Sequence, residues 1–169
     1  MKIAIVSDSH YKLDYLADCI NLLKEECEYL IHAGDFCTQE ALDILENSNL
    51  KTIKVFGNND YSLLHLTQKY NIKQEPYYFK IEDISFKLMH LPYHLNPDTN
   101  IVIFGHTHKF HSEYINKTLF VNPGEVCARE MPIISCVKLE INENEYIITR
   151  FHKKTDENNF KKEEYKYVK

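Results

Sequence analysis

Carboxylate, imidazole and amide side chains recur in short fragments between positions 8 and 108 of this 169-residue chain. In chain order the fragments are Asp8-Ser9-His10, Gly34-Asp35, Gly57-Asn58-Asn59-Asp60, His90 and Gly105-His106-Thr107-His108. Each fragment follows a short apolar stretch that is typical of a β-strand. Residues i and i+2 of an extended chain point the same way, so Asp8 with His10, and His106 with His108, should emerge as pairs. Together these oxygen and nitrogen donors suffice for two metal ions.

An alternation of strand and helix patterns positions the first three fragments. Apolar, β-branched stretches predict strands at 2–6, 29–31 and 52–56. Apolar residues at helical spacing predict helices over 13–23, 41–45 and 63–70. This order predicts a parallel sheet with right-handed crossovers, and ligands bind at the carboxyl edge of such a sheet.

The second half of the chain has the pattern of hairpins. Strands are predicted at 77–81, 84–89 and 101–104, and further hairpins turn at 116–117 and 142–144. No linker separates the two halves, so we expect two sheets of one domain over residues 1–152. Residues 153–169 are rich in charge and nearly free of aliphatic side chains. They predict a charged C-terminal tail, either frayed or folded as a surface helix.

The ordered set of fragments resembles the calcineurin-like metallophosphoesterase superfamily, and specifically its small single-domain prokaryotic phosphodiesterase branch. The resemblance covers roughly residues 1–150. It implies an α/β fold, a four-layer αββα sandwich of two mixed β-sheets flanked by helices, with a dinuclear metal site between the upper edges of the sheets. Carried over residue by residue, it assigns one metal to Asp8, His10 and His108, the other to Asn58, His90 and His106, and a bridging position to Asp35.

The chemistry of the donors agrees with that assignment. The two oxygens of Asp35 can hold two cations about 3.5–4 Å apart. Oxygen and imidazole donors suit Mn²⁺, our first expectation, or Fe, Zn²⁺ or Ni²⁺, better than Cu(I). Two divalent cations against two ligating carboxylates leave about two positive charges, which attract an anionic phosphate ester.

The resulting hypothesis is a metal-dependent phosphodiesterase in which a metal-bridging hydroxide attacks phosphorus in line. Asp35, Asn58 and His10 are the candidate catalytic residues, and Asn59 and Arg129 are candidates for substrate binding. Larger phosphatases of the superfamily carry a His where this chain has Asn59. Proton donation to the leaving group would then fall to His10 or to solvent. Arg129 could clasp a phosphoryl oxygen or pair with a surface acid such as Glu125.

Several nearby residues have plainer interpretations. Asp60 is expected to cap the helix that follows it. His32, inside an apolar strand, is expected to be a satisfied core or supporting histidine. Surface positions are expected for His65, His111 and His152, and His94 is expected to be a bystander in the loop after His90. That loop reads Leu91-Pro92 where the branch usually has Gly, so it should be shaped differently.

Composition excludes other classes. The net charge of −5 and the pI near 6.0 oppose a dedicated nucleic-acid surface. No apolar run approaches the roughly 20 residues that span a membrane, and no secretory signal is evident, so a cytoplasmic location is expected. The five cysteines lack metal-site spacing. They are expected to be buried, with Cys37 and Cys127, in loops near the site, as the candidates for reactivity.

A small phosphodiester is therefore the expected partner, with a homo-oligomer left open. Phosphomonoesterase or nuclease activity of the same superfamily is the nearest alternative. A non-catalytic scaffold or binding module is the alternative from another class, with the retromer scaffold subunit as a precedent by resemblance. Acceptable donors at all seven ligand positions favour an enzyme.

Overall fold

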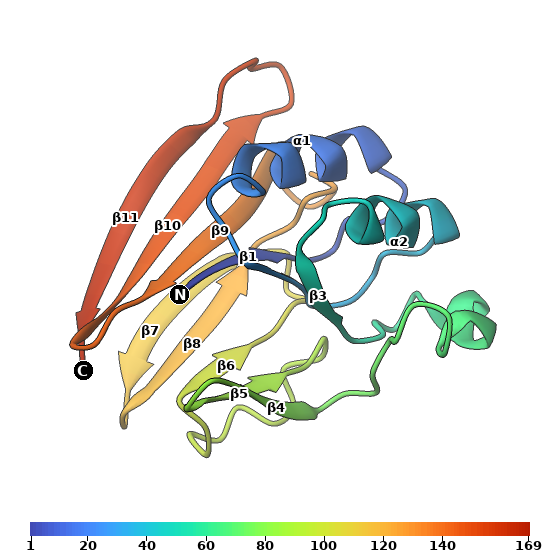
Figure 1. Cartoon of the computed structure of the whole chain (residues 1–169). Coiled ribbons are helices and arrows are strands. Elements are labelled where there is room, and N and C mark those ends of the chain that lie inside the picture. The colour runs from blue at the N-terminus through green and yellow to red at the C-terminus, as the bar shows by residue number, and fades with distance from the viewer.

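Strand β1 (Lys2–Val6) lies inside a mixed six-stranded sheet in the computed structural model, which describes residues 1–169 (Figure 1). The sheet order is β11-β10-β9-β1-β2-β3. β1 pairs in parallel with β2 (Tyr29–His32), and β2 with β3 (Lys51–Lys54). The other neighbours are antiparallel: β9 (Ile133–Ile141), β10 (Glu145–Lys154) and β11 (Lys161–Val168).

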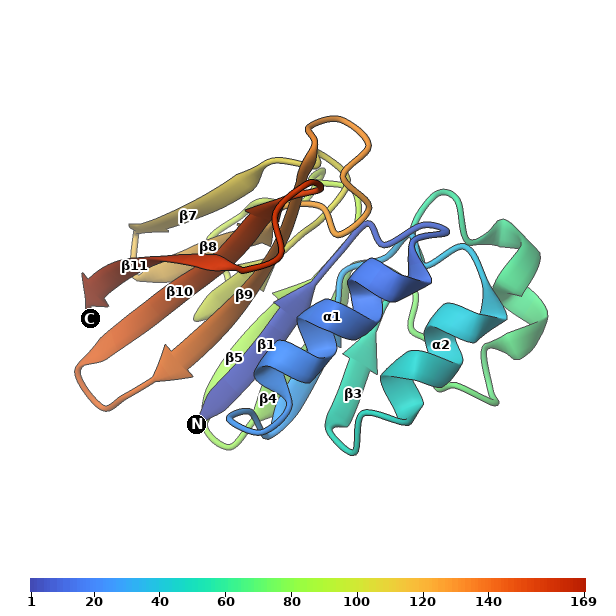
Figure 2. The ribbon, with the colours of Figure 1, turned by 90° about the horizontal axis from the view of Figure 1, so that it is seen from above.

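Both faces of β1 are buried, which explains its continuous apolar run. Its side chains alternate with period two, so Ile3 and Ile5 enter a core shared with the second sheet. Ala4 and Val6 face the opposite way, into a core formed with helices α1 (Leu13–Leu23) and α2 (Gln39–Glu46). Figure 2 shows both helices lying across this one face of the first sheet.

The second sheet has the order β4-β5-β6-β8-β7 and is also mixed. Its strands are β4 (Tyr77–Ile81), β5 (Ile84–Leu88), β6 (Ile101–Ile103), β7 (Phe110–Ile115) and β8 (Thr118–Pro123). The predicted turns at 82–83, 116–117 and 142–144 all join paired antiparallel strands. The α/β class with two mixed sheets is therefore confirmed.

The helical part of the prediction needs two corrections. The expected helix over 63–70 is a short 3-10 helix, η1 (Tyr61–Leu66). The outer side of the second sheet carries no α-helix, because the β5-to-β6 crossover of residues 89–100 contains Pro92 and Pro97, which disfavour one. This crossover is anchored by the buried Lys87, whose ammonium donates to the carbonyl oxygens of His94 and Asn96.

The expectation of a frayed tail or a surface helix after residue 152 is wrong. β10 continues to Lys154, and β11 pairs with β10 over eight residues. Tyr165 and Tyr167, two residues apart, pack against the core between the sheets, while their charged neighbours face solvent. Lys and Glu are common on edge strands, where they prevent pairing with other chains, so the charge concealed a strand. Neither α-helix reaches the length and apolarity of a membrane-spanning helix.

Candidate metal centre

Seven predicted ligands lie in loops that leave both sheets at one shared edge. Asp8 and His10 follow β1, and Asp35 and Asn58 follow β2 and β3. The three remaining histidines, His90, His106 and His108, follow β5 and β6. Backbone bonds join neighbouring loops, since the N–H of Asp8 donates to Gly34 and the N–H of His10 donates to Asp35. Ligand positions on different strands are thus fixed relative to one another.

One group of donor atoms surrounds a point between Asp8, His10 and His108. Asp8 Oδ2 accepts from Ser7 Oγ and from the His106 N–H, which leaves Oδ1 facing His108 Nε2 at 3.2 Å. Asp8 Oδ1 and His10 Nε2 are buried without a hydrogen-bond partner. Asp35 Oδ2 lies 3.6 Å from His10 Nε2. Buried polar atoms without partners are costly, and a cation would satisfy both of them.

A second group of donor atoms converges around Asn58. Asn58 Oδ1 lies 2.9 Å from His90 Nε2 and 3.1 Å from His106 Nδ1. Asp35 Oδ2 lies 3.4 Å from His90 Nε2, so this oxygen is close to both groups. Donors that each lie about 2.1 Å from one cation are about 3.0–3.4 Å from each other. The distances of 2.9 to 3.4 Å within both groups lie in or near this range, and the 3.6 Å between His10 Nε2 and Asp35 Oδ2 lies slightly above it.

The loop of His90 is fixed from two sides despite its Leu-Pro sequence. Its backbone N–H and that of Leu91 both donate to the Glu75 carboxylate. His90 Nδ1 contacts the Ala33 carbonyl oxygen at 2.8 Å, so Nδ1 is the donor and Nε2 is free to face Asn58. The His90 ring is fully buried, and its Nε2 atom points toward Asn58.

The backbone at the ligands is strained. Five of the seven have positive φ angles of 46° to 64°, namely Asp8, His10, Asp35, His106 and His108. Residues with side chains seldom adopt this left-handed region, and clusters of such strain occur at functional sites. Gly57 also packs tightly, since a Cβ there would lie 2.2 Å from Asp35 Oδ1.

The pKa values of two candidate ligands, His108 and Asp35, indicate an environment that favours positive charge. Burial lowers the pKa of His108, but its interactions with Asp8, Cys127 and Glu125 outweigh burial and raise the pKa to about 12. Burial also opposes ionisation of Asp35, yet His90 and Asn59 hold the pKa of this carboxyl below its usual range. The Asp35 carboxyl is thus ionised, and the protonated imidazole of His108 supplies positive charge at the site.

Of the two alternatives for Arg129, the one that pairs it with Glu125 as a surface acid is wrong. Glu125 is buried, and its Oε2 lies 2.6 Å from His108 Nδ1. The two carboxylate oxygens also accept backbone N–H groups of Arg129, Glu130 and Met131. These bonds outweigh burial and lower the pKa of Glu125 to about 2. The carboxylate fixes the His108 tautomer, and the side chain of Arg129 instead lies 3.7 Å from Glu130.

Asp60 does not cap η1 as expected, although it occupies the N-cap position. Its Oδ2 accepts the N–H groups of Asp35 and Gly57 at 2.8 and 2.7 Å, and its Oδ1 accepts that of Cys37 at 2.7 Å. Asp60 thus holds together the loops that follow β2 and β3. A hydrogen-bonding role of this kind has no sequence signal, because its partners are backbone groups.

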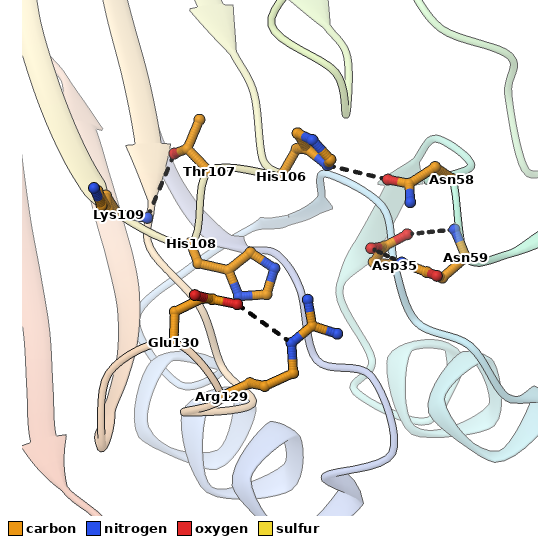
Figure 3. A pocket seen from close by; sticks show the side chains of 9 residues that line it. All are labelled: Asp35, Asn58, Asn59, His106, Thr107, His108, Lys109, Arg129 and Glu130. Atoms are coloured by element: carbon orange, nitrogen blue, oxygen red, sulfur yellow. Dashed lines mark hydrogen bonds and ion pairs between the residues drawn. The ribbon is translucent and has the colours of Figure 1, made fainter.

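The two candidate substrate-binding residues line a polar cavity of about 270 Å³ (Figure 3). Its walls are Asp35, Asn58, Asn59, His106, Thr107, His108, Lys109, Arg129 and Glu130. The backbone and side-chain amides of Asn59 both donate to the Asp35 carboxylate, at 2.8 and 2.7 Å. The side chain of Arg129 is 57% exposed. In this structure Asn59 positions Asp35, and its contact with substrate stays a prediction.

The other histidines and the cysteines have supporting or outlying roles. His32 is confirmed as a satisfied buried residue: its Nδ1 accepts the Gly34 N–H, and its Nε2 lies 3.0 Å from Ser9 Oγ. Exposed positions are occupied by His65, His94 and His111, while His152 is half-buried beside Glu163. All five cysteines are free and buried. Burial raises the pKa of Cys37 to about 12 and also raises that of Cys127, which argues against reactive thiolates.

One thiol nonetheless lies close to the site. The side chains of Cys127, His10 and His108 each offer a donor atom, and these atoms lie within 4.8 Å of one another. Cys127 Sγ donates to Glu125 Oε2 at 3.1 Å. The sequence had suggested a donor set without sulfur, and only the fold shows this proximity.

Comparisons with known proteins agree with the site. Residues 1–144 match the calcineurin-like phosphoesterase superfamily domain. The phosphodiesterase MJ0936 of Methanocaldococcus jannaschii is 30% identical over 160 residues, which cover 86% of this chain and 96% of that protein. A solved archaeal phosphodiesterase superposes with a TM-score of 0.78 at 29% identity, over 89% of this chain and 99% of its own.

A third relative shares the fold at lower identity. Zinc-complexed Vps29 of Entamoeba histolytica has a TM-score of 0.69 at 21% identity, over 98% of this chain and 99% of its own. With a matched domain over most of its length and a 30% identical relative, this chain belongs to the calcineurin-like phosphoesterase superfamily.

Proposed function

We propose that this protein is a metal-dependent phosphodiesterase with a dinuclear site. The observation that carries the proposal is the position of Asp35 Oδ2, which lies 3.6 Å from a nitrogen of one donor group and 3.4 Å from a nitrogen of the other. Asp8, His10 and His108 would hold one cation, and Asn58, His90 and His106 the other. Mn²⁺ is the preferred ion, and Zn²⁺, Fe or Ni²⁺ suit the same donors.

When bound, the two cations supply a water of lowered pKa for attack on phosphorus and offset the charge of the phosphoryl oxygens. The protein's residues position these components. Asn59 orients the Asp35 carboxylate through two hydrogen bonds, and Asn58 contributes a neutral donor that leaves the site electropositive. Arg129 and Lys109, on the wall of the polar cavity, bring cationic groups to the anionic substrate.

Protonation of the leaving group has no dedicated residue in this arrangement. Asn59 is occupied by Asp35, and burial lowers the pKa of His10, which favours a neutral ligand over an acid. The proposal therefore favours esters with good leaving groups, because these leave without a proton.

The test uses purified protein loaded with Mn²⁺ and bis-nitrophenyl phosphate as substrate. We expect hydrolysis that a chelator stops and that Asp35→Asn abolishes, since the amide can no longer share an anionic oxygen between two cations. Asp83→Asn, at the exposed turn between β4 and β5, is the matched control and should retain activity. Full activity of Asp35→Asn, or indifference to chelator, would contradict the proposal.

A binding module is the second candidate, favoured by similarity to Vps29, which is named for vacuolar protein sorting rather than for hydrolysis. Calorimetry separates the two candidates. Binding of Mn²⁺ or Zn²⁺ with no turnover of any ester supports the module, and so does a complete failure to bind metal after loading.

A further inference from the structure

A second cavity adjoins the metal centre beside Arg129. It has a volume of about 320 Å³ and is lined by His10, Tyr11, Lys12, Cys127, Ala128 and Arg129. We call it the Tyr11 cavity. Arg129 also lines the polar cavity, so the two cavities share this residue in their walls. His10, a candidate ligand, forms part of the wall, so an ester bound at the metals would have a substituent within reach.

The two cavities differ in chemistry. No hydrophobic residue lines the polar cavity, whereas Tyr11, Cys127 and Ala128 give the second an apolar wall. Tyr11 is 74% exposed and its hydroxyl makes no hydrogen bond. A tyrosine offers a rigid, flat surface that suits stacking with another aromatic ring. Arg129 adds a planar cation that can also stack on such a ring.

We infer that the Tyr11 cavity binds a flat aromatic substituent of a phosphodiester, an aryl group or a nucleobase, while the polar cavity takes the other substituent. A diester has two substituents, and the site offers two unlike cavities for them. A monoester would leave one cavity without a ligand. This inference rests on the proposed function, because the phosphoryl group must lie at the metal centre for its substituents to reach both cavities.

The experiment compares three diesters that share one leaving group. Methyl, phenyl and thymidine 5′ esters of p-nitrophenyl phosphate are hydrolysed by the Mn²⁺-loaded protein. Water adds to phosphorus and the P–O bond to the nitrophenyl group breaks. The products are p-nitrophenolate and the monoester of the retained substituent. In-line attack places the leaving group opposite the attacking water, so the nitrophenyl ring lies on the same side in all three esters and differences in KM report binding of the retained substituent.

We expect the KM of the aromatic esters to be about tenfold below that of the methyl ester, the size of a typical stacking contribution. Tyr11→Ala should remove this difference, and Tyr11→Phe should retain it. Tyr61→Ala is the matched control, because Tyr61 is also exposed and lines neither cavity. A preference for thymidine alone identifies a nucleobase, and a preference for both aromatic esters identifies a general aryl site.

Equal KM values for all three esters, or a preference that survives in Tyr11→Ala, would overturn the inference. Failure of the proposed function gives a different result, in which no ester is hydrolysed. Calorimetry with thymidine monophosphate and methyl phosphate then tests whether the Tyr11 cavity binds an aromatic group without turnover. A tenfold tighter Kd for the nucleotide that depends on Tyr11 supports the cavity without turnover, and equal Kd values reject it.

Discussion

The carboxylate of Glu125 connects a candidate metal ligand to the loop that carries Arg129. Its Oε2 contacts His108 Nδ1 and the Arg129 N–H, while Oε1 accepts the Met131 N–H. Carboxylates behind metal-binding histidines orient the ring and increase its basicity. A substitution of Glu125 should therefore lower metal affinity more than it lowers the stability of the fold.

Glu125→Gln tests that role. Every partner of the carboxylate is a donor, so the amide group of Gln would face another N–H and lose at least one bond. We expect Mn²⁺ affinity to fall about 10- to 100-fold, measured by calorimetry. Glu130→Gln removes a neighbouring but exposed carboxylate and should leave affinity near the wild-type value. Unchanged affinity in Glu125→Gln would assign the residue to loop structure alone.

Sequence could predict which residues lie at the site, but not all of their contacts. Asp8, Asp35 and the two His of the 106–108 fragment share chemistry and strand-end positions, which local pattern reveals. The burial of Glu125 depends on residues 129–131 folding back over it, which no spacing encodes. Asp60 likewise contacts only backbone groups.

At the scale of elements, the periodicity of apolar residues identified the strands that are buried on one or both faces. It did not identify β11, in which charged residues predominate. β11 has the sequence Lys-Lys-Glu-Glu-Tyr-Lys-Tyr-Val, and its only inward signal is the pair Tyr165 and Tyr167. Tyr167 reaches across to the second sheet, where its hydroxyl donates to the Ser112 carbonyl oxygen at 2.9 Å and lies 2.7 Å from Ser112 Oγ. β11 thus ties the edges of both sheets together.

Tyr167→Phe should lower the free energy of unfolding by about 1 kcal/mol, since it removes the hydroxyl and keeps the ring. Tyr167→Ala should lower the free energy of unfolding by about 2 kcal/mol or more, because the half-buried apolar surface of the ring is also lost. Urea titration measures both changes. Lys166→Ala, on the exposed side of the same strand, should stay within about 0.5 kcal/mol of the wild type. No change in either Tyr167 variant would mean that β11 is not docked in solution.

For the whole molecule, the proposed metal ligands divide between the two sheets. Asp8, His10, Asp35 and Asn58 belong to loops of the first sheet, and the three remaining histidines belong to the second. Alternating patterns predicted two sheets, but the pairing of their faces came only from the family resemblance, because each sheet presents an apolar face that could pack against several partners.

Metal binding should therefore stabilise the entire fold. At a metal concentration of 100 times Kd, the gain is about 2.7 kcal/mol, which corresponds to a Tm increase of roughly 5–10 °C. The interaction with carboxylates raises the pKa of His90 and His108 despite burial, so bound protons must leave when the metal binds. The Tm increase should thus be larger at pH 8 than at pH 6. Differential scanning calorimetry with and without Mn²⁺ measures this Tm increase. A Tm that is the same with and without metal at both pH values would contradict the prediction that metal binding links the two sheets.

This division of ligands also sets an order of events during synthesis. A nascent chain that ends before β5 has four of the donors and lacks every imidazole of the second sheet. Full-strength capture of a cation pair must wait until His106-Thr107-His108 has been made and the halves have met. If the proposed site binds its metals, their uptake is consequently a late event, and a chain that holds both ions has already joined its two halves.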